Sequence, residues 1–307
     1  MSQGDLFQVV LWWFYILIIG TLFLPLSKTL FSKFFDRGYI FSKIIGIAAV
    51  SYLIFIFGTL HILPFQRISL FVVLFIILIL NIIIFSRKKI KFNKVELYSY
   101  LFQEAFFFLS LLFWSYIKSF QPDIHGLEKF MDFGFMNSIL RSSYFPPIDM
   151  WLPPNSINYY YFGHLVTAVL IKLSNISPFI SYNLMLATIF AFLTTSAFSI
   201  VTTLVKSFTN SKRTIIASGI LSSILISFGG NLQTIYAFFK PYTPPENPIP
   251  FWNLQFLPFS FPNSYWYPNA TRFISNTIHE FPLYSFVVSD LHGHVLDIPF
   301  VLLTIAV

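Results

Sequence analysis

The sequence predicts an all-α integral membrane protein with about seven or eight transmembrane helices, and three observations lead to this fold class. Of the 307 residues, 56% are hydrophobic and only 10% are charged, whereas soluble domains carry about 25% charged residues. The mean hydropathy of +0.73 is correspondingly high. Apolar runs near the length of about 20 residues that crosses a bilayer recur along the chain. We therefore expect a multi-pass protein of the cell membrane, with lipid as its first partner.

The apolar runs divide the chain into two regions, 1–120 and 121–307. The first region holds four expected helices, at about 6–30, 39–63, 68–86 and 97–120. The second region begins with a polar loop, 121–158, and continues with runs at about 159–174, 180–205 and 213–238. A second long interfacial loop, 239–294, is rich in Pro, Asn, Trp and Tyr, and the last apolar run stops after 13 residues, 295–307. We expect the chain to be a fragment of a longer protein.

Basic residues predict how the chain is oriented. They concentrate in the first and third short loops, at 28–43 and 87–94. Since basic loops stay on the cytoplasmic side, the loop 121–158 should lie at the outer face. Three full crossings between the two long loops would put those loops on opposite faces, so we expect one run to be re-entrant. The candidate is 213–238, because Gly229-Gly230-Asn231 interrupts it.

The charge and cysteine content exclude several classes of function. The net charge is +7, but the basic residues fall between apolar runs instead of forming a patch with interleaved polar and aromatic readers. We therefore exclude a nucleic-acid partner. The chain has no cysteine, which rules out disulfides, thiolate zinc sites and cysteine nucleophiles. Nothing in the sequence indicates a protein partner.

The first long loop contains a predicted amphipathic helix at 126–141. Apolar residues recur there at helical spacing, and Glu128 and Asp132 lie four residues apart on one face. These carboxylates either solvate the helix and pair with Lys129 or Arg141, or are poised over a membrane-embedded substrate. The paired prolines of 144–154 then predict a rigid coil along the interface.

An aromatic and histidine motif opens the next apolar run. Tyr159, Tyr160 and Tyr161 point in three directions, so at least one hydroxyl should face protein, although an aromatic belt accounts for most of this pattern. His164 lies about one turn inside the helix. It is either a ligand or proton carrier, or a histidine satisfied by helix packing.

The second long loop holds the richest set of polar side chains. Asp290, His292 and His294 alternate, so an extended backbone would project all three to one side, and imidazole with carboxylate suits a divalent metal. Alternatively, Asp290 is the N-cap of the last helix. Arg272 offers the bidentate donors that phosphate prefers. Other candidates in this loop are Trp266 and Glu280.

Several of these stretches resemble the YYY membrane protein family, a domain of unknown function grouped with the GT-C glycosyltransferase superfamily. The resemblance runs from about Gly126 to the C-terminus. It rests on Leu127-Glu-Lys-Phe-Met-Asp-Phe-Gly-Phe, Phe145-Pro-Pro, Ile157-Asn-Tyr-Tyr-Tyr-Phe-Gly-His164, Gly230-Asn-Leu, Arg272-Phe-Ile, Glu280-Phe-Pro and Asp290-Leu-His-Gly-His294. The chain departs from the pattern at Gly293, where a proline is expected, and at Met150, where an acidic-Pro-Trp turn is expected.

The resemblance implies an active site at the outer face and inverting transfer of a sugar from a polyprenyl-phosphate-linked donor. Matched to this chain, it makes Asp132 the candidate base, with Glu128 as the alternative. It implies that three residues hold either a divalent metal, Mg or Mn, or the lipid phosphate. It implies that seven others bind the substrate. The first set is Asp290, His292 and His294; the second is Arg272, Tyr159, Tyr160, Tyr161, His164, Trp266 and Glu280.

Two rival functions remain open from the sequence. Four expected spans precede the acidic loop here, unlike superfamily members in which that loop follows the first helix, so the role of Asp132 is assigned by analogy. A transporter or flippase for a lipid-linked or polar solute would also use aromatic grooves, an intramembrane histidine and a broken helix. A non-catalytic membrane scaffold is the third alternative.

Overall fold

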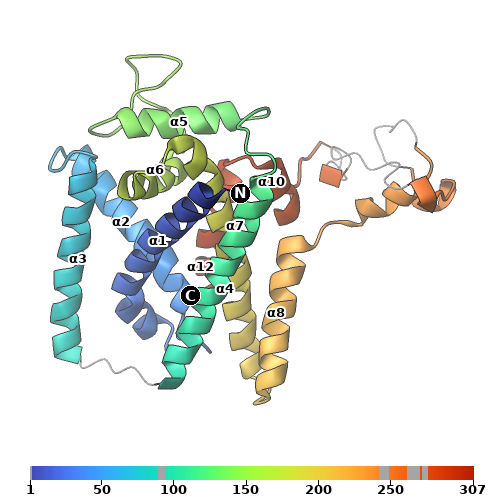
Figure 1. The fold of residues 1–307 in the computed structure, drawn as a ribbon, viewed down its shortest axis with the longest axis horizontal. Coiled ribbons are helices and arrows are strands. Elements are labelled where there is room, and N and C mark those ends of the chain that lie inside the picture. Colours follow the sequence, from blue (N-terminus) through green and yellow to red (C-terminus); the bar gives the residue numbers. More distant parts are fainter. Residues whose placement is uncertain (1, 89–93, 242–248, 261–269, 272–275) are drawn as a thin grey trace. The chain divides into compact units, whose positions relative to one another are not determined.

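The computed structural model describes residues 2–88, 94–241, 249–260, 270–271 and 276–307, and in these residues the chain is helical without named strands (Figure 1). The helices are α1 (Gln3–Leu30), α2 (Tyr39–Thr59), α3 (Arg67–Lys88), α4 (Lys94–Lys118), α5 (Lys129–Arg141), α6 (Phe162–Ser174), α7 (Pro178–Lys206), α8 (Lys212–Phe228), η1 (Leu232–Phe238), η2 (Phe251–Asn253), η3 (Pro258–Ser260), α10 (Pro282–Val288), α11 (Gly293–Leu296) and α12 (Ile298–Ala306).

Four of the described helices, α1, α2, α4 and α7, are long and apolar enough to cross a membrane. Shorter apolar stretches lie at Arg67–Ile83, in α6 and at Gly293–Ala306. The all-helical fold is confirmed. The described residues do not confirm seven or eight crossings, because several expected runs form helices shorter than a bilayer requires.

The chain folds as two compact units, the first made of Met1–Ser223 and Ser289–Val307 and the second of Ile224–Val288. In the second unit, α8 ends at Phe228, and the Gly229 N–H donates to the Leu225 carbonyl (2.8 Å). A Cβ at Gly229 would lie 2.3 Å from that carbonyl oxygen, so the close turn requires glycine. The expected interruption of 213–238 therefore lies directly after α8.

Helix α7 is the centre of the first unit. Within its most apolar window, 89% of the residues are buried, compared with 39% in α1. The indole N–H of Trp12 on α1 donates to Thr188 Oγ1 on α7 (2.9 Å), and Trp114 on α4 stacks on Phe190 with ring centroids 4.5 Å apart. Helices that face lipid on one side thus pack their other side against a buried central helix.

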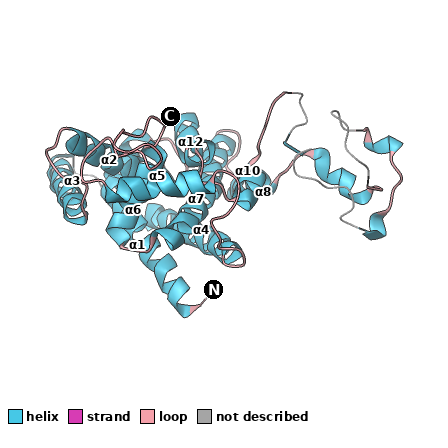
Figure 2. Ribbon diagram, turned by 90° about the horizontal axis from the view of Figure 1, so that it is seen from above, coloured by secondary structure: helices cyan, strands magenta, loops and turns pink. Residues whose placement is uncertain are grey.

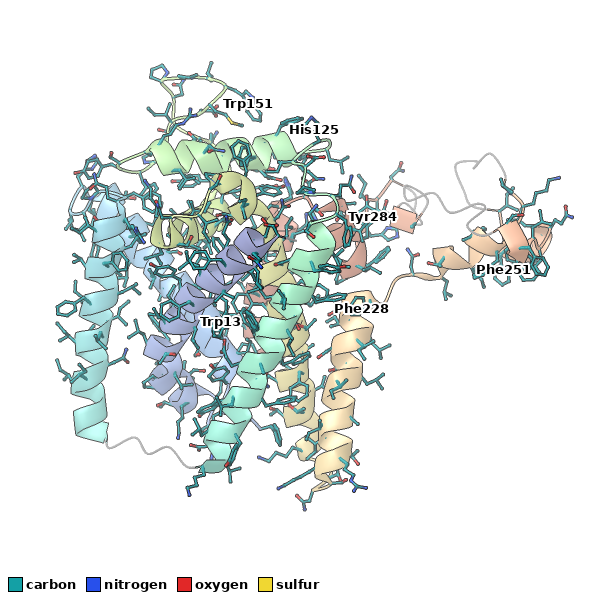
Figure 3. All side chains as sticks on the ribbon, in the orientation of Figure 1. Trp13, His125, Trp151, Phe228, Phe251 and Tyr284 are labelled. Carbon is teal, nitrogen blue, oxygen red and sulfur yellow. The ribbon has the colours of Figure 1, made fainter. Side chains whose placement is uncertain are left out.

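Helix α5 lies across one end of the first unit (Figures 1 and 2). The loops before and after α5 form hydrogen bonds to other segments. The Phe65 N–H donates to the Ser143 carbonyl (2.7 Å), and Asn183 Nδ2 donates to the Pro122 carbonyl (2.8 Å). Trp151 lies in the loop above α5 (Figure 3). The helix expected at 126–141 is therefore confirmed.

Helix α6 keeps both of its ends near α5. At its start, His164 contacts Asp132 of α5, and near its end Ile171 and Lys172 line a cavity together with Leu140 of α5. With 13 residues, it is about 20 Å long, too short for a hydrocarbon core of about 30 Å. By its length, α6 is a second candidate for a re-entrant run, and the re-entrant course expected for 213–238 stays a prediction.

The opposite end of the first unit carries the basic loops. There the Phe35 N–H donates to Thr203 Oγ1 (3.1 Å), and the Lys206 ammonium lies 5.8 Å from the Phe35 ring centroid. The buried Asp36 carboxylate accepts hydrogen bonds from the Gly38 N–H, Gln103 Nε2 and Ser199 Oγ. This network joins the α1–α2 loop to α4 and α7, and its basic surroundings match the expected cytoplasmic loops.

A buried ion pair connects α2 to α4 inside the bundle. Lys43 Nζ lies 2.8 Å from Glu104 Oε2, and the Lys43 side chain is only 1% exposed. Trp13 Nε1 and the Tyr39 hydroxyl donate to the two oxygens of the same carboxylate, and Figure 3 labels Trp13 within the bundle. Since charges in hydrocarbon need a partner, this pair fixes the relative position of three helices.

Removing the Glu104 charge should destabilise the protein more than removing that of Glu96, another carboxylate on α4. Glu104→Gln leaves the buried Lys43 without a counter-ion and should cost about 3 kcal/mol. Glu96→Gln affects Lys28, which is 16% exposed at a helix end, and should cost below about 1 kcal/mol. The free energy of unfolding in a denaturing-detergent titration measures both, and equal losses would contradict a structural role of the Lys43–Glu104 pair.

The geometry of α6 predicts which loops share a membrane face. The chain lacks cysteine, so single cysteines report accessibility without background. Asn155→Cys and Asn175→Cys should react with a membrane-impermeant maleimide from the same side of a sealed vesicle, and Ser207→Cys from the other. If Asn175→Cys reacts from the side of Ser207→Cys, α6 crosses the membrane.

Candidate functional site

The site begins with a carboxylate on the buried face of α5. Asp132, Phe135, Met136 and Ile139 are buried, and this spacing of three and four residues places them on one face of the helix. Asp132 is 0% exposed. A carboxylate on an otherwise apolar face is costly unless it is paired, so its partners decide what it can do.

His164 on α6 is the first partner of Asp132. Its Nε2 lies 3.1 Å from Asp132 Oδ1, and both side chains are 0% exposed. Because the partner is a carboxylate, Nε2 carries the proton and donates it. Asp132 Oδ2 accepts no hydrogen bond from the described residues. The carboxylate is thus held by one oxygen, while the other is buried without a hydrogen-bond partner.

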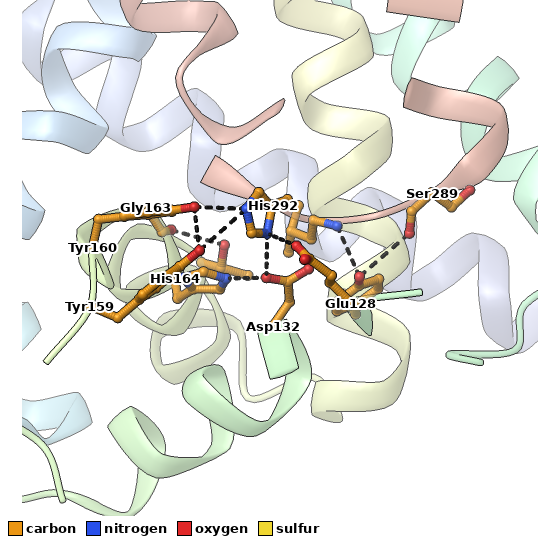
Figure 4. Close-up of polar contacts among 11 residues, drawn as sticks. Glu128, Asp132, Tyr159, Tyr160, Gly163, His164, Ser289 and His292 are labelled. Atoms are coloured by element: carbon orange, nitrogen blue, oxygen red, sulfur yellow. Dashed lines mark hydrogen bonds and ion pairs between the residues drawn. The ribbon is translucent and has the colours of Figure 1, made fainter. Parts of the chain in front are cut away.

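His292 brings the C-terminal loop to the same carboxylate (Figure 4). Its Nδ1 lies 2.9 Å from Glu128 Oε2 and 3.5 Å from Asp132 Oδ1. Its Nε2 lies 2.7 Å from the Tyr160 hydroxyl, which in turn accepts a hydrogen bond from the Tyr159 hydroxyl. Polar contacts therefore link the two tyrosine hydroxyls, through the imidazole, to the two carboxylates.

Gly293 allows Tyr160 to approach His292. A Cβ at Gly293 would lie 2.6 Å from Tyr160 Cε2, closer than side chains pack. Where the resemblance leads one to expect proline, glycine provides the space for this ring. Tyr161 points elsewhere: its ring centroid lies 6.4 Å from that of Phe55 on α2. The three tyrosines thus separate into two that contact the site and one that packs on the bundle.

Asp290 adds a second carboxyl group beside Asp132. Burial first, and the charge of the neighbouring Asp132 second, raise the pKa of Asp290 to about 7 from its ordinary 3.8. Burial also lowers the pKa of Lys129, an effect opposed by the nearby Asp290 carboxylate. With this pKa, the Asp290 carboxyl group can hold a proton beside Asp132 near neutral pH.

Tyr182 on α7 holds the loop that carries Asp290 and His292. The Leu291 N–H donates to the Tyr182 hydroxyl (2.9 Å), which donates to the Ser289 carbonyl (3.4 Å). Tyr182 is almost fully buried. No sequence pattern singled it out, because a tyrosine within an apolar run is typical of helix packing. Only the fold brings it to a loop more than 100 residues away.

The remaining predicted site residues lie in other elements or outside the described part. His294 lies in α11, exposed, with its ring centroid 5.7 Å from that of His292. Glu280 belongs to the second unit and accepts a hydrogen bond from Ser285 (2.6 Å). Trp266 and Arg272 lie outside the described residues, so their roles stay predictions.

Two expectations about the last histidine motif are wrong in detail. The backbone is extended at His292 but becomes helical at Gly293, so Asp290, His292 and His294 do not alternate along one extended edge. The N-cap of α11 is His292 and that of α12 is Asp297, neither through its side chain. Asp290 is therefore not a cap, because α11 begins two residues later than the cap interpretation requires.

The predicted divalent metal site is not preformed in the described residues. They contain no group of three His, Asp or Glu side chains arranged to hold a metal ion. The open oxygens Asp132 Oδ2 and Asp290 Oδ1 are hard donors of the kind that Mg²⁺ and Mn²⁺ prefer. Two such atoms suit a metal but do not define its site, so Mg or Mn binding stays a prediction.

Comparison with known families gives the protein its relatives. The model of an uncharacterized membrane protein family, DUF2298, matches residues 49–307. The chain belongs to this family. No curated protein and no solved structure matches the chain. The family confirms a membrane protein and includes every residue of the candidate site, but it assigns no reaction.

The raised pKa of Asp290 predicts how stability depends on pH. The pKa of Asp290 in the folded protein lies above 3.8. Its contribution to the free energy of unfolding is therefore fully present below about pH 4 and is lost as pH rises towards 7. Relative to Asp290→Asn, the wild-type protein should lose thermal stability across this range. Unfolding midpoints of both proteins between pH 4 and 8 measure the difference, with Asp149→Asn, a half-buried carboxylate of the neighbouring loop, as the control. Parallel profiles would contradict the shift.

Proposed function

We propose that this protein is a membrane glycosyltransferase of the GT-C-like type, which transfers a sugar from a polyprenyl-phosphate-linked donor at the outer membrane face. The observation that carries the proposal is the Asp132 carboxylate. One oxygen is held by His164, and the other is buried without a hydrogen-bond partner, in a cluster at the end of the helix bundle. An oriented carboxylate with an oxygen left to accept a proton is what a general base requires.

The proposed reaction is an inverting displacement. The acceptor hydroxyl oxygen attacks the anomeric carbon of the sugar, and its proton passes to Asp132 Oδ2. The bond between that carbon and the phosphate oxygen breaks, and the electron pair leaves with the polyprenyl phosphate. His164 orients the base through Oδ1. The pKa of Asp290, about 7, makes it the carboxyl group that holds a proton beside the base near neutral pH.

The leaving phosphate needs positive charge or donors. In the described residues Lys129 opens α5 next to Asp290, and His292 lies between the two tyrosine hydroxyls and the carboxylates. The family resemblance adds Arg272 to this role. A bound Mg²⁺ or Mn²⁺ would supply Lewis acidity to the same phosphate. Tyr159, Tyr160 and Trp266 are the proposed walls of the sugar or prenyl groove.

The distribution of charge supports an outer-face site. The basic α1–α2 loop lies at the end where Asp36 and Lys206 lie, whereas α5 and its carboxylates lie at the other end. By the positive-inside rule the α5 end faces outwards. A polyprenyl chain would lie in the adjoining bilayer, so its phosphate would reach the level of α5.

A second candidate function is transport or flipping of a lipid-linked or polar solute. The observation that favours it is the pair of neighbouring carboxyl groups, Asp132 and Asp290, one of which has a pKa of about 7. Buried groups that exchange a proton near neutral pH are common in proton-coupled transport. A scaffold without chemistry is a weaker alternative, because it gives no reason for a buried charged cluster.

Asp132→Asn tests the transferase. In proteoliposomes with a radiolabelled polyprenyl-phosphate sugar, this variant should lose about 10²- to 10⁴-fold in transfer rate, since the amide cannot accept the proton. Asp149→Asn, a carboxylate on the neighbouring loop, should keep the wild-type rate. The thermal midpoint of each variant checks folding, and assays with Mg²⁺, Mn²⁺ or a chelator test the metal.

Two outcomes would contradict the transferase. Full activity of a folded Asp132→Asn variant would remove the proposed base. Absence of product with wild-type protein, together with Asp132-dependent movement of the labelled lipid between leaflets, would instead identify a transporter. Glu128→Gln distinguishes the role of Glu128 from that of Asp132, because Glu128 contacts His292 and not Asp132 Oδ2.

A further inference from the structure

A second pocket lies in the first unit, apart from the carboxylate site. It is a cavity of about 490 Å³ where the start of α3, the end of α6 and the start of α7 meet. Its walls are Gln66, Arg67, Leu140, Ile171, Lys172, Asn175, Ile176, Ser177 and Pro178. None of the residues of the carboxylate site lines it, so the pocket has no part in the proposed transfer reaction.

The pocket carries positive charge and no negative charge. Arg67 and Lys172 line it, and no acidic residue does. The Arg67 guanidinium donates to the Tyr15 hydroxyl (3.2 Å) and lies 5.6 Å from the Phe71 ring centroid. Lys172 lies 5.3 Å from the Phe65 ring centroid. Among the described residues neither forms an ion pair, so aromatic rings position two cations whose charge stays uncompensated.

Two helix starts add to this potential. Helix α7, 29 residues long, begins at Pro178, and the side chain of its N-cap, Ser177, makes no capping hydrogen bond. Helix α3 begins at Arg67 itself. The N-terminus of a helix carries a partial positive charge and free N–H groups. Asn175 and Gln66 supply further exposed polar side chains at the rim.

We propose that this pocket binds a phosphate group, as the head of a membrane lipid. Phosphate matches the two cations, the helix starts and the amide donors. A lipid source is favoured because apolar side chains of α3 continue from the pocket along the membrane: Ile68 is 70% exposed and Phe71 42%. The acyl chains would lie along these residues. The proposal does not depend on the transferase function.

The test uses the full chain purified in detergent. Its thermal midpoint is followed during titration with short-chain phosphatidylglycerol, with the matching diacylglycerol that lacks the phosphate, and with inorganic phosphate at constant ionic strength. Phosphatidylglycerol should raise the midpoint and diacylglycerol should not. A rise with inorganic phosphate alone would overturn the lipid assignment and identify a free-anion site.

Variants link the response to the pocket. Arg67→Gln and Lys172→Gln should each weaken the apparent affinity for phosphatidylglycerol about tenfold, the effect of losing one charge-assisted contact. Asn175→Asp, an exposed position with φ of 59° that aspartate tolerates, adds a negative charge to the rim and should weaken binding without removing a structural contact. Arg141→Gln, a basic residue of α5 outside this pocket, is the matched control.

The proposal fails if no probe shifts the midpoint. It also fails if the double variant of Arg67 and Lys172 responds as the wild-type protein does. If that double variant does not fold, Asn175→Asp decides alone: an unchanged response to phosphatidylglycerol would overturn the pocket, and a weakened response would support it. Transfer activity is not the readout, so failure here leaves the transferase proposal untouched.

Discussion

The pairing of Asp132 with His164 is the interaction on which the α5 end of the protein depends. Both side chains are fully buried, and a buried carboxylate without a partner would be too costly to keep. The pair joins α5, which lies across the bundle, to α6, which supports it. It also fixes the point that His292 must reach. Without this contact, the segments that carry His164 and His292 would not be held at the same carboxylate.

The buried charged groups of the first unit are of two kinds. At the basic end and in the bundle, Asp36 and Glu104 each accept several hydrogen bonds, and Lys43 pairs with Glu104. Such satisfied groups bind helices together. At the α5 end, Asp132 and Asp290 each keep an oxygen without a partner. Unsatisfied buried polar atoms also occur in the bundle, so the α5 end is distinguished by two neighbouring carboxyl groups, Asp132 and Asp290, in one cluster.

The short helix α6 contributes a residue to each of the two proposed sites at the α5 end. Because both of its ends stay near α5, it contributes His164 to the carboxylate cluster at one end and Lys172 to the cationic pocket at the other. The two sites therefore share a scaffold but have opposite charge. An acidic cluster suits proton transfer, and a basic pocket suits a phosphate anchor, so a lipid-linked substrate and a bulk lipid need not compete for the same residues.

Much of the fold and part of the site followed from the sequence alone. The apolar runs gave the helices α1 to α4 and α7, because lipid requires long apolar helices whatever their neighbours are. The periodicity of 126–141 gave α5 with Asp132 on it, and local motifs indicated Tyr160, His164, Asp290 and His292. These are properties of spacing and composition, which act over a few residues. Only the tertiary structure shows that α6 is a short helix packed against α5, that Tyr161 packs on the bundle, that His294 lies in α11, and that Tyr182 holds the C-terminal loop. It also brought Arg67 and Lys172, 105 positions apart in the sequence, to one pocket. Side-chain direction and long-range contact depend on how whole helices pack, and no local pattern contains that information.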